Sequence, residues 1–251
     1  MRAIAQNTAQ HLDPVLFAEE ALDFTPDEWQ RDVLRYEGKK IILNCCRQSG
    51  KSTVAAVKAV HRAMFFPGSL ILLVSPSQRQ SSELFKKVNE LLGQLQETPK
   101  KTEDNRLSVS FQGGSRIVSL PSTESTVRGF SSPDLVIIDE ASRVSDELYF
   151  SIRPMLAVGQ GELIILSTPH GKRGFFHREW TDENENCKKV LITAKECPRI
   201  SEEFLREESQ ILGEWWFQQE YFCEFKEGVD SLFTYEMVIS AIDNEIEPWN
   251  V

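Results

Sequence analysis

The chain has 251 residues, 41% hydrophobic and 26% charged, and its 28 Lys and Arg against 38 Asp and Glu give a formal charge of −10. These fractions are ordinary for a globular protein and exclude a wholly disordered chain. The five cysteines show no paired spacing, which excludes a disulfide-stapled mini-protein, and no apolar stretch approaches the roughly 18 residues of a membrane span. We therefore expect a soluble, intracellular protein with no membrane partner.

Segments of helical period alternate with short, continuous apolar runs along the chain. We expect helices at residues 14–21, 26–36, 51–66 and 78–95, and from residue 201 onward. We expect strands at residues 40–44, 70–75, 135–138, 163–166 and 190–193. Because strands that are apolar throughout are buried on both faces, this pattern predicts a parallel sheet covered by helices.

Shorter signals mark the turns and ends of these elements. Thr25 is expected to cap a helix whose first residue is Pro26. Residues 107–111 alternate strictly between apolar and polar, and a glycine turn joins them to 116–120, so a β-hairpin is predicted. The charged segment 99–105 is expected to be a loop.

The strongest chemical signal is Cys45-Cys-Arg-Gln-Ser-Gly-Lys-Ser52, which lies between an expected strand and an expected helix. It fits the phosphate-loop pattern, except that Cys45 replaces the leading glycine. In such a loop, backbone N–H groups and a helix N-terminus cradle phosphate oxygens. Lys51 would reach the β- and γ-phosphates, and the Ser52 hydroxyl would hold Mg²⁺. The strand-turn-helix context disfavours the alternative, a chance Gly-Lys-Ser at a helix start.

A second signal is Leu135-Val-Ile-Ile-Asp-Glu140, in which an apolar strand delivers two carboxylates to one edge of the sheet. Asp139 suits Mg²⁺, and Glu140 suits polarisation of an attacking water. An acidic pair after a strand can also merely cap a helix. Together with the phosphate loop upstream, the pair predicts a nucleotide hydrolase.

These motifs resemble those of viral terminase large subunits, the motors that pump DNA into procapsids. Arg47 to Ser52 resembles the arginine-containing Walker A motif, in which replacement of the leading glycine is tolerated. Asp139 to Ser142 resembles the Walker B motif with its catalytic glutamate, and Leu166 to Pro169 resembles the coupling motif. The likeness spans roughly residues 26–168 and keeps the family's order throughout.

The resemblance implies roles for residues at the nucleotide. Gln30, in Trp29-Gln30, would read adenine, and Ser167 and Thr168 would couple hydrolysis to movement; the alternative for these two is a plain strand-to-loop turn. Arg47 would contact nucleotide or form a structural salt bridge. The loop residues expected to bind ATP are Arg47, Gln48, Ser49, Gly50, Lys51, Ser52 and Thr53.

The Ser/Thr-rich segment 121–133, an expected loop, carries a further implied role. Val127-Arg-Gly129 resembles the segment that supplies the arginine finger, so Arg128 would complete the transition state from a neighbouring subunit. Arg143, just past the acidic pair, is the competing candidate.

The implied fold is an α/β P-loop NTPase of the RecA-like kind, with a mainly parallel central sheet flanked by helices, a β-hairpin insertion, and helical additions at both ends. We expect an N-terminal helical segment at 1–36, an ATPase core at 37–200 and a C-terminal helical lid or linker at 201–251. We expect the family's nuclease domain to be absent, so no nuclease activity is expected of this chain. Five aromatic residues in this lid are expected to anchor it to the core rather than to stack on bases: Trp215, Trp216, Phe217, Tyr221 and Phe222.

The implied function is an ATPase motor that uses ATP and Mg²⁺ to drive double-stranded DNA into a procapsid in the host cytoplasm. The implied partners are DNA, the portal protein, the small terminase subunit and further copies in a ring, expected to be a pentamer. The acidic charge disfavours a tight duplex-DNA reader, so any DNA contact is expected to be local or transient. The alternative function is a single-domain helicase-like or regulatory P-loop NTPase that acts on nucleic acid.

Overall fold

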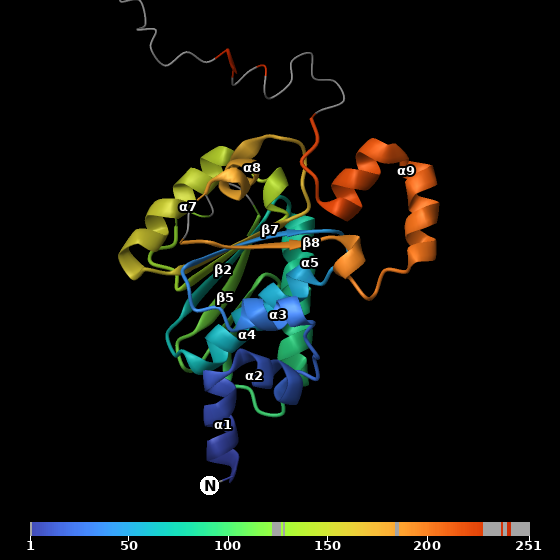
Figure 1. The fold of residues 1–251 in the computed structure, drawn as a ribbon. Helices are drawn as coiled ribbons and strands as arrows, with labels where there is room; N and C mark the ends of the chain where they lie inside the picture. The colour runs from blue at the N-terminus through green and yellow to red at the C-terminus, as the bar shows by residue number, and fades with distance from the viewer. Residues whose placement is uncertain are drawn as a thin grey trace, which may run out of the picture.

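The computed structural model describes residues 2–121, 127, 129–183, 186–227, 237, 240 and 241. Within these residues one sheet contains eight strands. The strands are β1 (Lys40–Cys45), β2 (Leu70–Ser75), β3 (Lys101–Asn105), β4 (Ser108–Phe111), β5 (Arg116–Pro121), β6 (Leu135–Asp139), β7 (Glu162–Ser167) and β8 (Lys188–Ile192). Their order across the sheet is β3-β4-β5-β2-β6-β7-β1-β8 (Figure 1).

The sheet is parallel from β5 to β8 and antiparallel only where β3, β4 and β5 meet. The predictions of a mainly parallel sheet and of a β-hairpin, formed here by β4 and β5, are therefore confirmed. Pairing sets Asp139 of β6 opposite Leu166 of β7, and Ser167 of β7 opposite Asn44 of β1. The carboxyl ends of β6, β7 and β1 are therefore level at one edge, where open α/β sheets place their ligands.

Helices cover both faces of the sheet (Figure 1). The described helices are α1 (Arg2–Leu12), α2 (Pro14–Ala21), α3 (Glu28–Leu34), α4 (Lys51–Phe65), α5 (Gln78–Gln94), α7 (Asp146–Gly159), α8 (Gly174–Thr181) and α9 (Glu202–Phe222). Two short 3₁₀ turns, η1 (Ala141–Arg143) and η2 (Ala194–Glu196), follow β6 and β8. None of these helices is long and apolar enough to cross a membrane.

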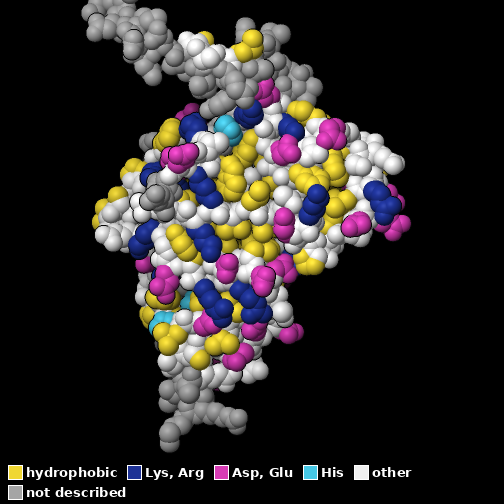
Figure 2. Space-filling view, in the orientation of Figure 1, with side chains coloured by type: hydrophobic (Ala, Val, Ile, Leu, Met, Phe, Trp, Pro, Cys, Tyr) yellow, Lys and Arg dark blue, Asp and Glu magenta, His cyan; other side chains and the backbone are white. Residues whose placement is uncertain are grey.

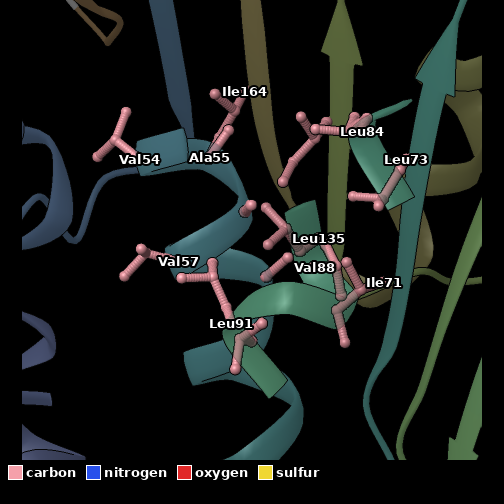
Figure 3. Close-up of a cluster of buried hydrophobic side chains, with 14 of the residues drawn as sticks. Val54, Ala55, Val57, Ile71, Leu73, Leu84, Val88, Leu91, Leu135 and Ile164 are labelled. Carbon is pink, nitrogen blue, oxygen red and sulfur yellow. The ribbon is translucent and has the colours of Figure 1, made fainter. Parts of the chain in front are cut away.

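Alternate strand residues point into two separate cores. Ile41 and Leu43 of β1 pack with α4 and α5, whereas Ile42 packs with α7 and α8. Figure 3 shows the first core, where Val54 and Val57 of α4 and Leu84, Val88 and Leu91 of α5 meet strand residues Ile71, Leu73, Leu135 and Ile164. Burial on both faces explains why these strands are apolar throughout.

Two local predictions were wrong. The helix expected from Pro26 begins at Glu28 with Asp27 as its cap, because the Gln30 side chain reaches back and accepts a hydrogen bond from the Asp27 N–H at 2.9 Å. Residues 101–105, expected to be a loop, form the edge strand β3. Backbone pairing with β4 holds this strand in place, because every β3 side chain is exposed. Its sequence therefore lacks the apolar pattern by which buried strands are predicted.

The last long helix, α9, bends at Gly213, whose φ of 72° and ψ of 161° are not helical. Its C-terminal arm packs Phe217 and Tyr221 into a small core with Cys46, Ala194 and Cys197. Trp216 is 44% exposed. Two of the five aromatic residues are thus buried against the rest of the protein, as an anchoring role requires. The division of the chain at residues 36 and 200 stays a prediction.

Candidate active site

The turn between β1 and α4 has a backbone that only particular residues can adopt. Gly50 has φ of +89°, a left-handed conformation that costs glycine least. A Cβ added there would lie 2.7 Å from the Gln30 Nε2, so the buried Gln30 amide would have to shift to admit any other residue. Cys45, at the position where the phosphate-loop pattern has glycine, is the last strand residue and lies fully buried in the core. The turn is therefore complete without a glycine at residue 45.

Lys51, the first residue of α4, directs its ammonium group back across the turn. The Nζ lies 3.2 Å from the Thr168 Oγ1, 3.4 Å from the Cys46 carbonyl oxygen and 3.9 Å from the Glu140 Oε1. Its side chain is 7% exposed. A buried cation beside the N-terminus of a 15-residue helix makes this turn attractive to an anion such as phosphate.

The next residue, Ser52, meets the end of β6. The Ser52 Oγ donates to the Asp139 Oδ2 at 3.1 Å, and the Asp139 Oδ1 accepts from the Glu140 N–H at 2.9 Å. Burial, and then the neighbouring Glu140 carboxylate, raise the pKa of Asp139 to about 6. In phosphate-loop sites, a carboxylate and a hydroxyl are the ligands that the protein supplies to Mg²⁺, and phosphate and water oxygens supply the others. The residues present therefore fit Mg²⁺.

Glu140 stands between Asp139 and η1 in a left-handed conformation, with φ of 50° and ψ of 43°. A residue other than glycine in that region stores about 1–3 kcal/mol of strain, which the surrounding structure must offset. The result is a carboxylate that is 30% exposed, next to the almost fully buried Asp139. The Glu140 carboxylate is therefore accessible to water while Asp139 faces the Ser52 hydroxyl, so the two carboxylates have different surroundings.

The end of β7 connects these groups. The Thr168 Oγ1 accepts from Lys51 and donates to the Cys45 carbonyl oxygen at 2.9 Å. The Ser167 Oγ lies 2.8 Å from the Ser142 Oγ and accepts from the Ser142 N–H at 3.2 Å. Ser167 and Thr168 thus contact, respectively, the turn after Glu140 and the turn that carries Lys51.

The other predicted residues have different surroundings. Gln30 is 1% exposed and lies against Gly50. The Arg47 Nε lies 2.5 Å from the Glu220 Oε2 of α9. Arg47 therefore forms a salt bridge, which was one of its two expected roles, the other being contact with nucleotide. Arg128 lies outside the described residues. Arg143 ends η1 on the surface, close enough to His170 that its positive charge, after burial, lowers the His170 pKa.

The contacts of two further residues with this turn were not predicted from the sequence. Glu220 pairs with Arg47 from 173 positions away. The Arg199 Nη2 lies 2.6 Å from the Ser49 carbonyl oxygen, 150 positions away. A lone charged residue in a loop or on a helix has no local pattern, so only the fold reveals these partners.

Comparisons with known proteins identify the family to which this chain is similar. The family model described as terminase large subunit, T4likevirus-type, N-terminal, matches residues 42–238. The terminase large subunit of Thermus phage G20c is 31% identical over 176 residues, which are 62% of this chain and 36% of that protein. This chain therefore spans well under half the length of that relative.

Two solved structures have the same fold. The large terminase ATPase domain of Thermus phage P74-26 matches with a TM-score of 0.74 at 23% identity, covering 84% of this chain and 97% of that domain. The large terminase of a thermophilic bacteriophage, solved with ADP, matches with a TM-score of 0.64 at 13% identity, covering 86% of this chain and 53% of that one. The α/β fold is thus that of phage terminase ATPase domains.

Proposed function

The chain belongs to the family of terminase large subunits, in the region that the family model describes as N-terminal, and we propose that it is the ATPase motor domain of a viral DNA-packaging machine. One observation carries the proposal. Lys51, Ser52, Asp139 and Glu140, drawn from two segments of the chain, converge at one edge of the sheet in the arrangement that nucleotide hydrolysis needs. The terminase of the thermophilic bacteriophage, solved both with ADP and with ATP-γ-S, supports nucleotide binding in this family's fold.

Each residue of the site has a role in ATP hydrolysis. The Lys51 ammonium group and the N-terminus of α4 hold the β- and γ-phosphates, and Ser52 and Asp139 hold Mg²⁺. Mg²⁺, when bound, supplies positive charge against the phosphate oxygens. Glu140 accepts the proton of the water whose oxygen attacks the γ-phosphorus, while the bond to the bridging oxygen breaks and ADP leaves.

Contacts around the site would carry its state to the rest of the domain. Thr168 contacts both the Lys51 ammonium group and the Cys45 carbonyl oxygen, so the end of β7 would move with the Lys51 side chain. The Arg47 N–H donates to the Glu220 carbonyl oxygen at 3.4 Å, and its guanidinium pairs with the Glu220 carboxylate. Gln219, which precedes Glu220 in α9, accepts from the Gly171 N–H at 3.0 Å, just after the coupling motif. The lid helix α9 therefore contacts both the phosphate loop and the segment that follows the coupling motif.

Assembly completes the proposed mechanism. Arg128 supplies the finger to a neighbouring copy in a ring, which we take to be a pentamer, and Arg143 is the competing candidate. A finger is worth roughly 10³–10⁵ in rate, so hydrolysis should depend on assembly. The test is mixing: Arg128→Ala and Glu140→Gln chains are each inactive alone, and the mixture regains activity where an intact Glu140 meets an intact Arg128. If Arg128→Ala keeps full activity in the assembled motor, Arg143 is the residue to substitute next.

We place this activity in the host cytoplasm, on double-stranded DNA, with the portal protein and the small terminase subunit as partners. Figure 2 shows Lys and Arg side chains interspersed with Asp and Glu on the face drawn, rather than gathered into one basic patch. This mixture fits a net charge of −10 and favours local, transient DNA contacts over tight binding.

The direct test is steady-state ATP hydrolysis by the purified chain with Mg²⁺, with and without duplex DNA and the portal protein. A motor domain hydrolyses ATP, and DNA and assembly increase the rate. Binding without turnover would indicate a regulatory NTPase, and strand separation of a short duplex would indicate a helicase-like enzyme. Plasmid incubated in parallel with Mg²⁺ or Mn²⁺ should stay intact, because no nuclease activity is expected of this chain, and reproducible nicking would contradict that expectation.

A further inference from the structure

Arg199 lies between η2 and α9, and its guanidinium group binds two distant parts of the chain at once. The Nη1 and Nη2 lie 3.2 and 2.7 Å from the Asp27 Oδ1 and Oδ2, which is a bidentate pair. The Nη2 also lies 2.6 Å from the Ser49 carbonyl oxygen in the phosphate loop. Only a planar fork with several N–H donors can reach these three acceptors together.

These contacts converge on Gly50. The Arg199 Nη2 lies 3.5 Å, and the Gln30 Nε2 2.7 Å, from the point that a Cβ on Gly50 would occupy. Asp27 joins the two side chains, because its carboxylate receives Arg199 and its N–H donates to the Gln30 Oε1 at 2.9 Å. The phosphate loop, Gln30 and Arg199 therefore form one connected group around Gly50.

We propose that Arg199 is a positioning residue for the nucleotide: it fixes the phosphate loop, through Ser49, relative to Gln30, through Asp27. This inference rests on the proposed function, in which the loop holds the phosphates and Gln30 reads the base. A nucleoside triphosphate must satisfy both at once, so their relative position decides affinity and the preference for adenine. Arg199 lies just before α9, so it also connects the phosphate loop to the segment that leads into the lid helix.

A purely structural salt bridge would have a different effect. The Arg199 and Asp27 side chains are 47% and 21% exposed, and pairs that exposed add little to stability. The chain offers a matched control in Arg35, whose Nε and Nη2 lie 3.1 and 2.6 Å from the Asp13 carboxylate, with side chains 53% and 25% exposed. This pair is likewise bidentate and similarly exposed, but among the described residues Arg35 has no contact with the phosphate loop.

The experiment compares Arg199→Gln, Arg199→Lys, Asp27→Asn and Arg35→Gln for binding of fluorescent ATP and GTP analogues, and for the KM and kcat of ATP hydrolysis. We expect Arg199→Gln to raise the Kd and KM for ATP about tenfold, the effect of losing one charge-assisted contact, with kcat changed less than about twofold. The ATP-over-GTP preference should fall in parallel. Lysine should restore little of the loss, Asp27→Asn should resemble Arg199→Gln without adding to it in the double variant, and Arg35→Gln should match the wild type.

Unchanged ATP affinity and base preference in a folded Arg199→Gln chain would overturn the inference, as would an equal loss in Arg35→Gln. If Arg199→Gln fails to fold, Arg199→Lys and Asp27→Asn carry the same comparison. A wild-type chain that binds ATP no better than Lys51→Ala would contradict the proposed function itself, and this inference with it. Normal wild-type binding with no effect at Arg199 contradicts the inference alone.

Discussion

The Ser52 hydroxyl lies 3.1 Å from the Asp139 carboxylate, although the two residues are 87 positions apart in the chain. One stands in the first turn of α4 and the other ends β6, so the contact exists only because β1 and β6 lie on either side of β7 in the sheet. The sheet order thereby brings the phosphate loop to the acidic pair. In the proposed function, this contact is where Ser52 and Asp139 would hold Mg²⁺.

Substitution of Ser52 tests whether the contact serves Mg²⁺. Ser52→Ala removes the hydroxyl, and kcat for ATP hydrolysis should fall roughly 10²-fold, the scale of losing one electrostatic stabiliser of the transition state. Ser52→Thr keeps the hydroxyl and should stay close to wild type. The readout is kcat across a Mg²⁺ titration. Equal activity of the alanine and threonine variants at every Mg²⁺ concentration would mean that the hydroxyl holds no metal.

Gly50→Ala tests the backbone of the phosphate loop. A Cβ would meet the Gln30 Nε2 at 2.7 Å on a backbone with φ of +89°, so we expect a loss of about 1–2 kcal/mol in the free energy of unfolding and weaker ATP binding. The control is Gly93→Ala in α5, where a Cβ meets nothing within 4 Å. Alanine there should raise stability by up to about 1 kcal/mol, because it favours the helix. Chemical denaturation of both variants gives the comparison, and stabilisation at residue 50 would refute the described turn.

A buried ion cluster joins α4 to the start of β7. The Lys58 Nζ lies 2.7 Å from the Glu162 Oε1, and the Arg62 Nη2 lies 3.0 Å from the Glu162 Oε2. Burial lowers the pKa of Lys58. Glu162→Gln would leave Lys58 buried without its counter-charge, so we expect a loss of about 3–5 kcal/mol in unfolding free energy.

The control for Glu162 is Glu90→Gln in the exposed Lys86–Glu90 pair, whose side chains are 69% and 61% exposed. That substitution should change stability by no more than about 0.5 kcal/mol. Urea denaturation of the two variants measures the difference. Similar small effects at both sites would show that the Lys58 cluster contributes little.

Much of the candidate site could be predicted because its residues lie in two short motifs, in which neighbouring positions supply the groups that bind phosphate and metal. Lys51 and Ser52 follow directly from a turn between a strand and a helix, and Asp139 and Glu140 end an apolar run, so each signal is contiguous in sequence. The edge strand β3 could not be predicted, because its exposed residues pair only through the backbone. Arg199 could not be predicted either, because its contacts with Asp27 and Ser49 depend on tertiary folding across 172 and 150 positions.

Stability at mildly acidic pH should depend on His61. Its ring packs against Phe17 and Phe65, and its Nε2–H donates to the Gln10 carbonyl oxygen at 3.0 Å. Burial, with smaller effects of charge on His11 and Arg62, lowers the pKa of His61 to about 4. The unfolded chain, with a histidine pKa of about 6.5, therefore binds more protons, so the contribution of His61 is complete above pH 6.5 and is lost as pH falls towards 4.

The expected loss over that window is about 3 kcal/mol, and His61→Leu should remove this part of the pH dependence. The measurement is unfolding free energy from denaturant titrations at several pH values between 4 and 7.5. The slope with pH decides the outcome, since the substitution also changes packing at every pH. An identical slope in wild type and His61→Leu would contradict the assigned environment of His61.

In the proposed function Glu140 activates water, and the site still binds ATP when the Glu140 carboxylate is removed. The direct measurement is the pair of ATP affinity and single-turnover hydrolysis rate for Glu140→Gln, beside Lys51→Ala and wild type under assembling conditions. We predict that Glu140→Gln binds ATP as wild type does while hydrolysis falls by at least about 10²-fold, whereas Lys51→Ala loses both. Hydrolysis by Glu140→Gln at the wild-type rate would contradict it.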